Sequence, residues 1–110
     1  QISAKDLDHW LQNEAQQPLL IDVREDHEIK IAAFPFQVLH LPLSKFSSWA
    51  ETFSQKIPLE RPLVVICHSG IRSMNFGTWL LEKNSHYEIW NLEGGIDSWS
   101  LTIDSSLPRY

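Results

Sequence analysis

The segment "VVICHSGIRS" (residues 64–73) joins a strand pattern to a helix pattern and contains the only cysteine of the chain. Residues 63–67, "LVVIC", are an apolar run that predicts a strand buried on both faces. Residues 73–84, "SMNFGTWLLEKN", place apolar side chains at helical spacing and predict a helix. Cys67 therefore lies at the carboxyl end of a strand, just before a loop and the start of a helix.

The rest of the chain alternates between helix and strand patterns. Helices are predicted at residues 2–14 with Ser3 as the cap, at 24–29 as a single turn, from Ser44 as the cap through Phe53, and at 96–100; strands are predicted at 19–23, 38–43 and 86–92. This alternation predicts an α/β fold with a mostly parallel sheet, covered by helices on both faces. In such sheets the ligand crevice lies beyond the carboxyl ends of the strands, which is where Cys67 falls.

The composition indicates a single globular domain spanning residues 1–110. A net charge of -5 gives nucleic acid no overall attraction, so an anionic ligand needs a local site. One cysteine cannot form an internal disulfide, and no apolar run is long enough to span a bilayer. Without a signal-peptide pattern we expect a cytoplasmic protein that contacts no membrane. The histidines are scattered and predict no metal site: His9, His27, His40, His68 and His86.

The loop after Cys67 has the features of an anion-binding site. Backbone N–H groups at the start of a helix lack partners within the helix, and the helix dipole adds positive potential there. Gly70 allows the loop to curl, and Arg72 adds a guanidinium suited to oxyanions. A thiol among these groups is expected to ionise readily and to act as a nucleophile without a separate base. The alternative is an unreactive core residue, because free cysteine is among the most buried residue types.

Three short motifs follow one another along the chain: "LIDVREDHE" at 20–28, "CHSGIRS" at 67–73 and "LEGGIDSW" at 92–99. The first contains Asp-Val-Arg with a glutamate four residues on, the second Cys-x-x-x-x-Arg before a small residue, and the third Leu-x-Gly-Gly-x-x-x-Trp. In this order and at this spacing they resemble the signatures of the rhodanese family. The segment "IKIAAFPFQVLHLP" (29–42) departs from the family pattern, so the resemblance leaves the path of residues 30–40 open.

The resemblance implies a three-layer fold with a five-stranded, mostly parallel sheet, and the activity of a single-domain sulfurtransferase. Cys67 would attack the outer sulfur of thiosulfate or another sulfane donor, release sulfite and hold the sulfur as a persulfide. Cyanide, a small thiol or a protein would then accept the sulfur, and no cofactor is implied. The residues of the loop would bind the donor and stabilise the sulfur anion: His68, Ser69, Gly70, Ile71, Arg72 and Ser73.

Asp22 and Arg24 match the Asp-Val-Arg motif of the family. The resemblance implies that they form, with Glu28, a polar network that supports the Cys67 loop from the end of a neighbouring strand. The alternative is a solvated surface cluster in which Arg24 and Glu28 make a helix-spaced ion pair. His68 is expected to line the mouth of the loop rather than to act as a base.

Other functions compete for the same residues. Cysteine phosphatases also combine a thiolate with an arginine, but their loop has one residue more than the four between Cys67 and Arg72. Thioredoxin-like or arsenate reductase chemistry needs a second cysteine, and a papain-like hydrolase needs a longer chain. A different class is a non-catalytic rhodanese-like module that docks proteins or relays sulfur in a larger assembly. Exposed tryptophans beside the loop would mark such a docking surface.

Overall fold

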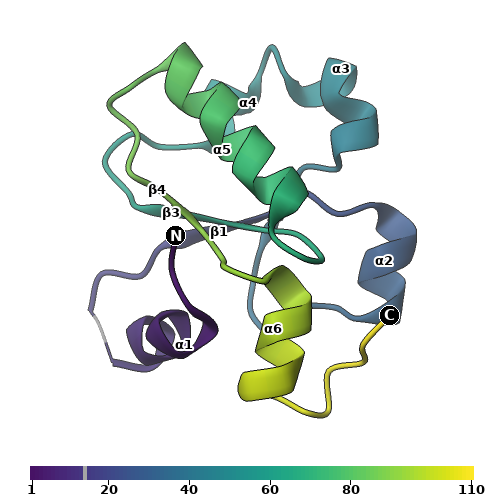
Figure 1. Cartoon of the computed structure of the whole chain (residues 1–110). Coiled ribbons are helices and arrows are strands. Elements are labelled where there is room, and N and C mark those ends of the chain that lie inside the picture. The colour runs from purple at the N-terminus through teal and green to yellow at the C-terminus, as the bar shows by residue number, and fades with distance from the viewer. Residues whose placement is uncertain (14) are drawn as a thin grey trace.

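The computed structural model describes residues 1–13 and 15–110 (Figure 1). Within this part of the chain the strands are β1 (Leu19–Asp22), β2 (Leu39–His40), β3 (Leu63–Ile66) and β4 (Ile89–Asn91). The helices are α1 (Ala4–Asn13), α2 (Asp26–Ile31), α3 (Phe46–Trp49), α4 (Phe53–Lys56), α5 (Ile71–Lys83) and α6 (Gly95–Thr102), with a 3-10 helix η1 (Leu43–Lys45). Glu14, the last residue of the predicted first helix, lies outside the described residues.

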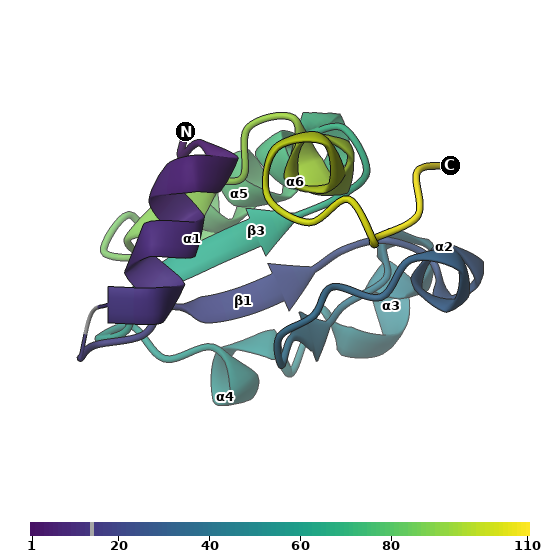
Figure 2. The same cartoon turned by 90° about the horizontal axis from the view of Figure 1, so that it is seen from below.

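All pairings between these strands are parallel, in the order β2-β1-β3-β4. The predicted α/β class is therefore confirmed. Figure 1 shows α3, α4 and α5 on one side of the sheet and α1 and α6 on the other. Figure 2 looks onto the sheet from the side of α1 and α6. The helices thus make the outer two of three layers, as the resemblance implied.

Alternating side chains of the central strands supply two separate cores. On β3, Val64 and Ile66 pack with α1 and α6, whereas Leu63 and Val65 pack with α3 and α5 on the opposite face. All four residues are completely buried. A strand covered on both faces has no polar side, which explains the uninterrupted apolar run in the sequence.

The expected five-stranded sheet was wrong for the described residues, in which four strands form the sheet. Beyond β4 the described part of the chain makes one isolated parallel bridge, between Ile2 and Leu92. Extension is impossible because the helix begins at once: the Ser3 hydroxyl accepts the N–H of Asp6 and caps α1. The predicted Ser3 cap is confirmed, and the chain before α1 therefore contributes a single bridge rather than a strand.

The helix expected to start at Ser44 is also wrong in part. Ser44 does not cap it, because its N–H and hydroxyl both bond to the Glu25 carboxylate. The chain instead forms η1, α3 and α4 in turn, with a break after Trp49 where Thr52 N–H returns to the Trp49 carbonyl. The strand predicted at 86–92 is shortened to β4 because the Asn84 side chain holds a turn through the His86 N–H.

The order of the strands places a switch in topology between β1 and β3. The chain goes from β1 to β2 on one side, and then returns to place β3 on the other side of β1. In open α/β sheets ligands bind beyond the carboxyl ends of the strands at such a point. Asp22 ends β1 opposite Ile66 of β3, and Cys67 follows Ile66 directly. The fold therefore brings the first two sequence motifs to the same end of the sheet.

Among the described residues, no helix combines the length and the apolar character needed to cross a membrane.

Candidate active site

The Cys67 sulfur is buried and also accepts hydrogen bonds from two backbone N–H groups. Cys67 is only 1% exposed and packs in the core on the α5 side of the sheet. The Gly70 N–H donates to the Cys67 Sγ at 3.0 Å and the Ser73 N–H at 3.4 Å, while the Ser73 Oγ lies 3.3 Å from it. Burial and amide contact thus occur together, and two converging N–H groups can stabilise negative charge on the sulfur.

Gly70 gives the loop its curl. It occupies the cap position of α5 with a φ of 101°, in the left-handed region that favours glycine. This turn starts α5 at Ile71, two residues before the predicted start at 73, and brings Ser73 into the first helical turn. The Ser73 N–H therefore has no carbonyl partner in the helix and is free to face the sulfur.

Asn91 holds the loop from β4, and sequence reasoning missed it. Its Nδ2 donates to the Gly70 carbonyl at 3.1 Å, and its Oδ1 accepts the hydroxyl of Ser73. Asn91 is 7% exposed and ends β4, the strand that pairs with β3. Its position at the carboxyl end of a predicted strand was the available signal, since polar side chains there face the same crevice as Cys67.

The start of α6 packs directly on the Cys67 loop. The Ile96 N–H donates to the Cys67 carbonyl at 2.9 Å, and the Asp97 N–H donates to the His68 carbonyl at 3.1 Å. Gly95 allows this approach, because a Cβ there would lie 2.3 Å from the Cys67 carbonyl oxygen. The motif at residues 92–99 therefore holds the backbone of the motif at residues 67–73 in place.

Arg72 makes a bidentate ion pair with Glu28 across the mouth of the loop. Its Nη1 lies 2.6 Å from Glu28 Oε1 and its Nη2 lies 2.7 Å from Oε2. The Glu28 side chain is 8% exposed and that of Arg72 is 35% exposed. Arg72 holds the pKa of Glu28 at about 2, and Glu28 in turn raises the pKa of Arg72. The guanidinium expected to bind an anionic donor is thus already paired with a carboxylate.

Asp22 and Arg24 form a second ion pair, which unlike the pair of Arg72 and Glu28 is completely buried. The Arg24 Nη2 lies 2.9 Å from Asp22 Oδ2, and the Arg24 Nε and backbone N–H also donate to the same carboxylate. Burial acts to lower the pKa of Arg24, but its bonds to Asp22 and Tyr110 outweigh this and raise it. The alternative of a solvated cluster with an Arg24–Glu28 pair is therefore wrong.

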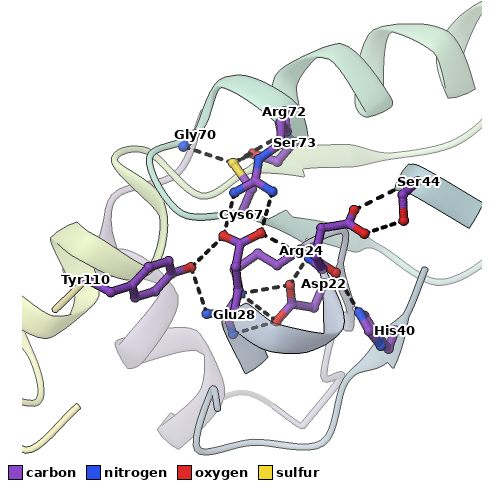
Figure 3. A network of polar contacts seen from close by, with 11 residues as sticks. Asp22, Arg24, Glu28, His40, Ser44, Cys67, Gly70, Arg72, Ser73 and Tyr110 are labelled. Carbon is purple, nitrogen blue, oxygen red and sulfur yellow. Dashed lines mark hydrogen bonds and ion pairs between the residues drawn. The ribbon is translucent and has the colours of Figure 1, made fainter. Parts of the chain in front are cut away.

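Tyr110 joins the two ion pairs. Its hydroxyl donates to Glu28 Oε2 at 2.9 Å and accepts a hydrogen bond from Arg24 Nη1 at 3.1 Å (Figure 3). Its ring stacks on His68, with centroids 4.1 Å apart and planes 17° apart. The sequence carried no local signal for this contact, because Tyr110 lies 82 residues from Glu28 along the chain.

The other predicted loop residues differ in their exposure to solvent. His68 is half-buried under Tyr110, while Ser69 and Ile71 are exposed. Ser73 is completely buried beside the sulfur. In residues 1–13 and 15–110 no group of three or more histidine, cysteine or acidic side chains is arranged to hold a metal ion.

Comparison with known proteins shows which family and fold this chain shares. The family model described as "Rhodanese-like domain" matches residues 3–102. The "Rhodanese-like/PpiC domain-containing protein 12, chloroplastic" of Arabidopsis thaliana is 39% identical over 111 residues, which cover 100% of this chain and 35% of the relative. YtwF of Bacillus subtilis, which has sulfurtransferase in its name, is 37% identical over 80 residues, covering 73% of this chain and 71% of the relative.

A solved structure, that of a rhodanese-related protein from Thermoplasma volcanium, superposes with a TM-score of 0.71 at 26% identity and covers 97% of this chain and 93% of that chain. The chain spans only about a third of the plant relative. The family match itself includes β1, the Cys67 loop and the start of α6. Because it extends over nearly the whole sequence and includes every part of the site except Tyr110, this chain belongs to the rhodanese-like domain family.

Proposed function

We propose that this chain transfers a sulfane sulfur through a persulfide on Cys67. The observation that supports this most is the pair of N–H groups, from Gly70 and Ser73, that point at the cysteine sulfur. Such donors stabilise the attacking thiolate. They also stabilise the terminal sulfur anion of a persulfide, which is bonded to the cysteine sulfur. No cofactor takes part in the proposed reaction.

The proposed reaction has two displacement steps. In the first, the Cys67 thiolate attacks the outer sulfur of thiosulfate or a similar donor; a new S–S bond forms, and the S–S bond of the donor breaks. Sulfite leaves with the electron pair, and Cys67 carries the sulfur as R–S–S⁻. In the second, cyanide or a thiolate attacks that terminal sulfur and regenerates the Cys67 thiolate. Neither step requires a net proton transfer, so the proposed reaction needs no general base.

Donor binding involves Arg72. An anionic donor gains full use of the guanidinium only by displacing the Glu28 carboxylate, which now occupies both of its terminal nitrogens. Glu28 would keep its bonds from Tyr110 and from the Glu25 N–H after such an exchange. The exchange therefore leaves no buried carboxylate without a donor, although it gives up the ion pair between Arg72 and Glu28.

Side-by-side assays test the proposed reaction class. We expect thiocyanate from thiosulfate and cyanide, and no hydrolysis of an aryl phosphate, because the loop with four residues between Cys67 and Arg72 suits one sulfur atom better than a phosphate group. Cys67→Ser should abolish thiocyanate formation with an unchanged circular dichroism spectrum. Phosphate release without thiocyanate formation would contradict the proposal.

A second candidate is a module dedicated to one protein acceptor. The chain covers 35% of the plant relative, so in that protein the matching region is joined to other sequence. Next to the Cys67 loop, α5 exposes Ile71 at 69% and Met74 at 39%, which is apolar surface that a partner could cover. Slow discharge of the persulfide by excess small thiol, with fast discharge by one protein, would favour this candidate. We propose the cytoplasm, rich in reduced thiols, as the compartment for either reaction.

A further inference from the structure

The segment that follows α6, residues 103–110, folds back toward the Cys67 loop. The Leu107 side chain is buried, and the Leu107 carbonyl accepts the Ser100 hydroxyl at 2.5 Å. Arg109 makes an ion pair with Asp97 of α6 at 2.8 Å. Both views of the fold place the end of this segment beside α2 (Figures 1 and 2). The segment lies beyond the residues matched by the family model.

Tyr110 is the residue of this segment that reaches the site. Its ring covers the imidazole of His68, the residue directly after the nucleophile, and its hydroxyl bonds to both Glu28 and Arg24. Burial raises the pKa of Tyr110, so the hydroxyl remains protonated at neutral pH and donates to Glu28. Tyr110 thus contacts the Cys67 loop and both ion pairs at once.

These contacts connect Tyr110 to the residues around the buried sulfur. Figure 3 shows the Glu28 carboxylate bonded to the Arg72 guanidinium and the Tyr110 hydroxyl bonded to Glu28. Cys67 itself is 1% exposed. Because the sulfur is buried, a reactant reaches it only after side chains around it move, and Tyr110 contacts two residues there, His68 and Glu28.

We propose that Tyr110 is a specificity-determining residue that limits which reactants reach Cys67. With the ring on His68 and the hydroxyl on Glu28, small reactants are favoured; a bulky acceptor reacts only when segment 103–110 moves aside. The link to sulfur acceptors rests on the proposed function, whereas the control of access to Cys67 is a property of the fold. The chemical class selected is a small sulfur nucleophile or anion over a large thiol.

Alkylation of Cys67 tests the access directly on the 110-residue chain, with iodoacetamide as the small reagent and fluorescein maleimide as the bulky one. Tyr110→Phe keeps the ring but loses the hydrogen bonds, and we expect the maleimide rate to rise about tenfold, equivalent to about 1.4 kcal/mol. Tyr110→Ala also loses the stack, and we expect about a further tenfold. The iodoacetamide rate should rise less in both variants.

Tyr87→Phe is the matched control, because it also removes a tyrosine hydroxyl, one that bonds to the Ile57 carbonyl away from the site. Its maleimide rate should stay within about twofold of the wild-type rate, an interval far below the tenfold step. Urea midpoints of all three variants show whether the rates follow global stability instead. A wild-type maleimide rate in Tyr110→Ala, or an equal rise in Tyr87→Phe, would overturn the proposal.

Sulfur transfer gives an independent readout of size selection. In Tyr110→Ala we expect the ratio of kcat/KM for glutathione to that for cyanide to rise about tenfold, in line with the loss of the ring stack. An unchanged ratio in an active variant counts against the proposal. If no variant forms a persulfide but the alkylation rates follow the predicted order, the proposed function fails and the control of access by Tyr110 stands.

Discussion

Gly95→Ala should destabilise the fold at the point where α6 meets the Cys67 loop. Gly95 has a φ of 59°, a conformation in which alanine is strained. The added Cβ would lie 2.3 Å from the Cys67 carbonyl oxygen and 2.5 Å from that of His68. Both are backbone atoms that cannot rotate away, so α6 and the loop must separate.

The cost has two parts. The left-handed conformation costs an alanine roughly 1–2 kcal/mol. Separation breaks the bonds from the Ile96 N–H to the Cys67 carbonyl and from the Asp97 N–H to the His68 carbonyl, at about 1 kcal/mol or more for each group left buried and unpaired. Together the loss is about 4 kcal/mol, a large part of the roughly 5–15 kcal/mol that stabilises a typical domain.

Urea unfolding followed by tryptophan fluorescence measures this loss. With an m-value of about 2 kcal/mol per molar urea, the midpoint should fall by about 2 M. Gly77→Ala is the control, because Gly77 lies within α5 without a positive φ and a Cβ there meets one side-chain atom, the Ile89 Cγ2 methyl, at 3.3 Å. Its midpoint should move by less than about 0.5 M. A similarly small change in Gly95→Ala would refute the inferred contact between α6 and the loop.

Three further predictions concern the site. Asn91→Ala removes the amide that holds the Gly70 carbonyl and the Ser73 hydroxyl, so the rate of sulfur loading should fall about tenfold at saturating donor; an unchanged rate would contradict its positioning role. Arg72→Ala should raise the KM for thiosulfate about tenfold or more, with Arg72→Lys intermediate because lysine lacks the guanidinium fork, and equal KM values would exclude Arg72 from donor binding. Arg72 lowers the pKa of Glu28 from 4.5 to about 2, so Glu28 stabilises the fold above pH 4.5 and loses this contribution as the pH falls toward 2. Between pH 4.5 and pH 2 the wild type should lose about 2 kcal/mol more of its unfolding free energy than Glu28→Gln does. This is less than the full pKa difference implies, because Arg72 is partly in solvent. Equal losses for the two proteins in urea titrations would argue against the ion pair.

The central strands and the Cys67 loop could be predicted because their signals are local. A continuous apolar run up to Cys67 is buried on both faces only in the middle of a sheet that helices cover on both sides, and Gly70 marks the turn that follows. The helix expected from Ser44 failed because tertiary contacts decide there. Glu25, which lies 19 residues away, takes both the N–H and the hydroxyl of Ser44.

The sequence indicated that Asp22, Arg24 and Glu28 belong to one polar network, but not which residue each of them pairs with. Sequence spacing suggested Arg24 with Glu28, whereas the fold pairs Arg24 with Asp22 and Glu28 with Arg72. The second pair joins residues 44 apart, and only the parallel order of β1 and β3 brings them together. Tyr110 was missed for the same reason, since no local pattern links it to α2.

Intact-mass spectrometry of the chain after treatment with thiosulfate tests the central claim most directly. We predict a gain of one sulfur atom that reductant removes, and no gain in Cys67→Ser under the same conditions. A wild-type chain that remains at its unmodified mass, or a Cys67→Ser chain that gains the same sulfur, would contradict sulfur transfer through Cys67.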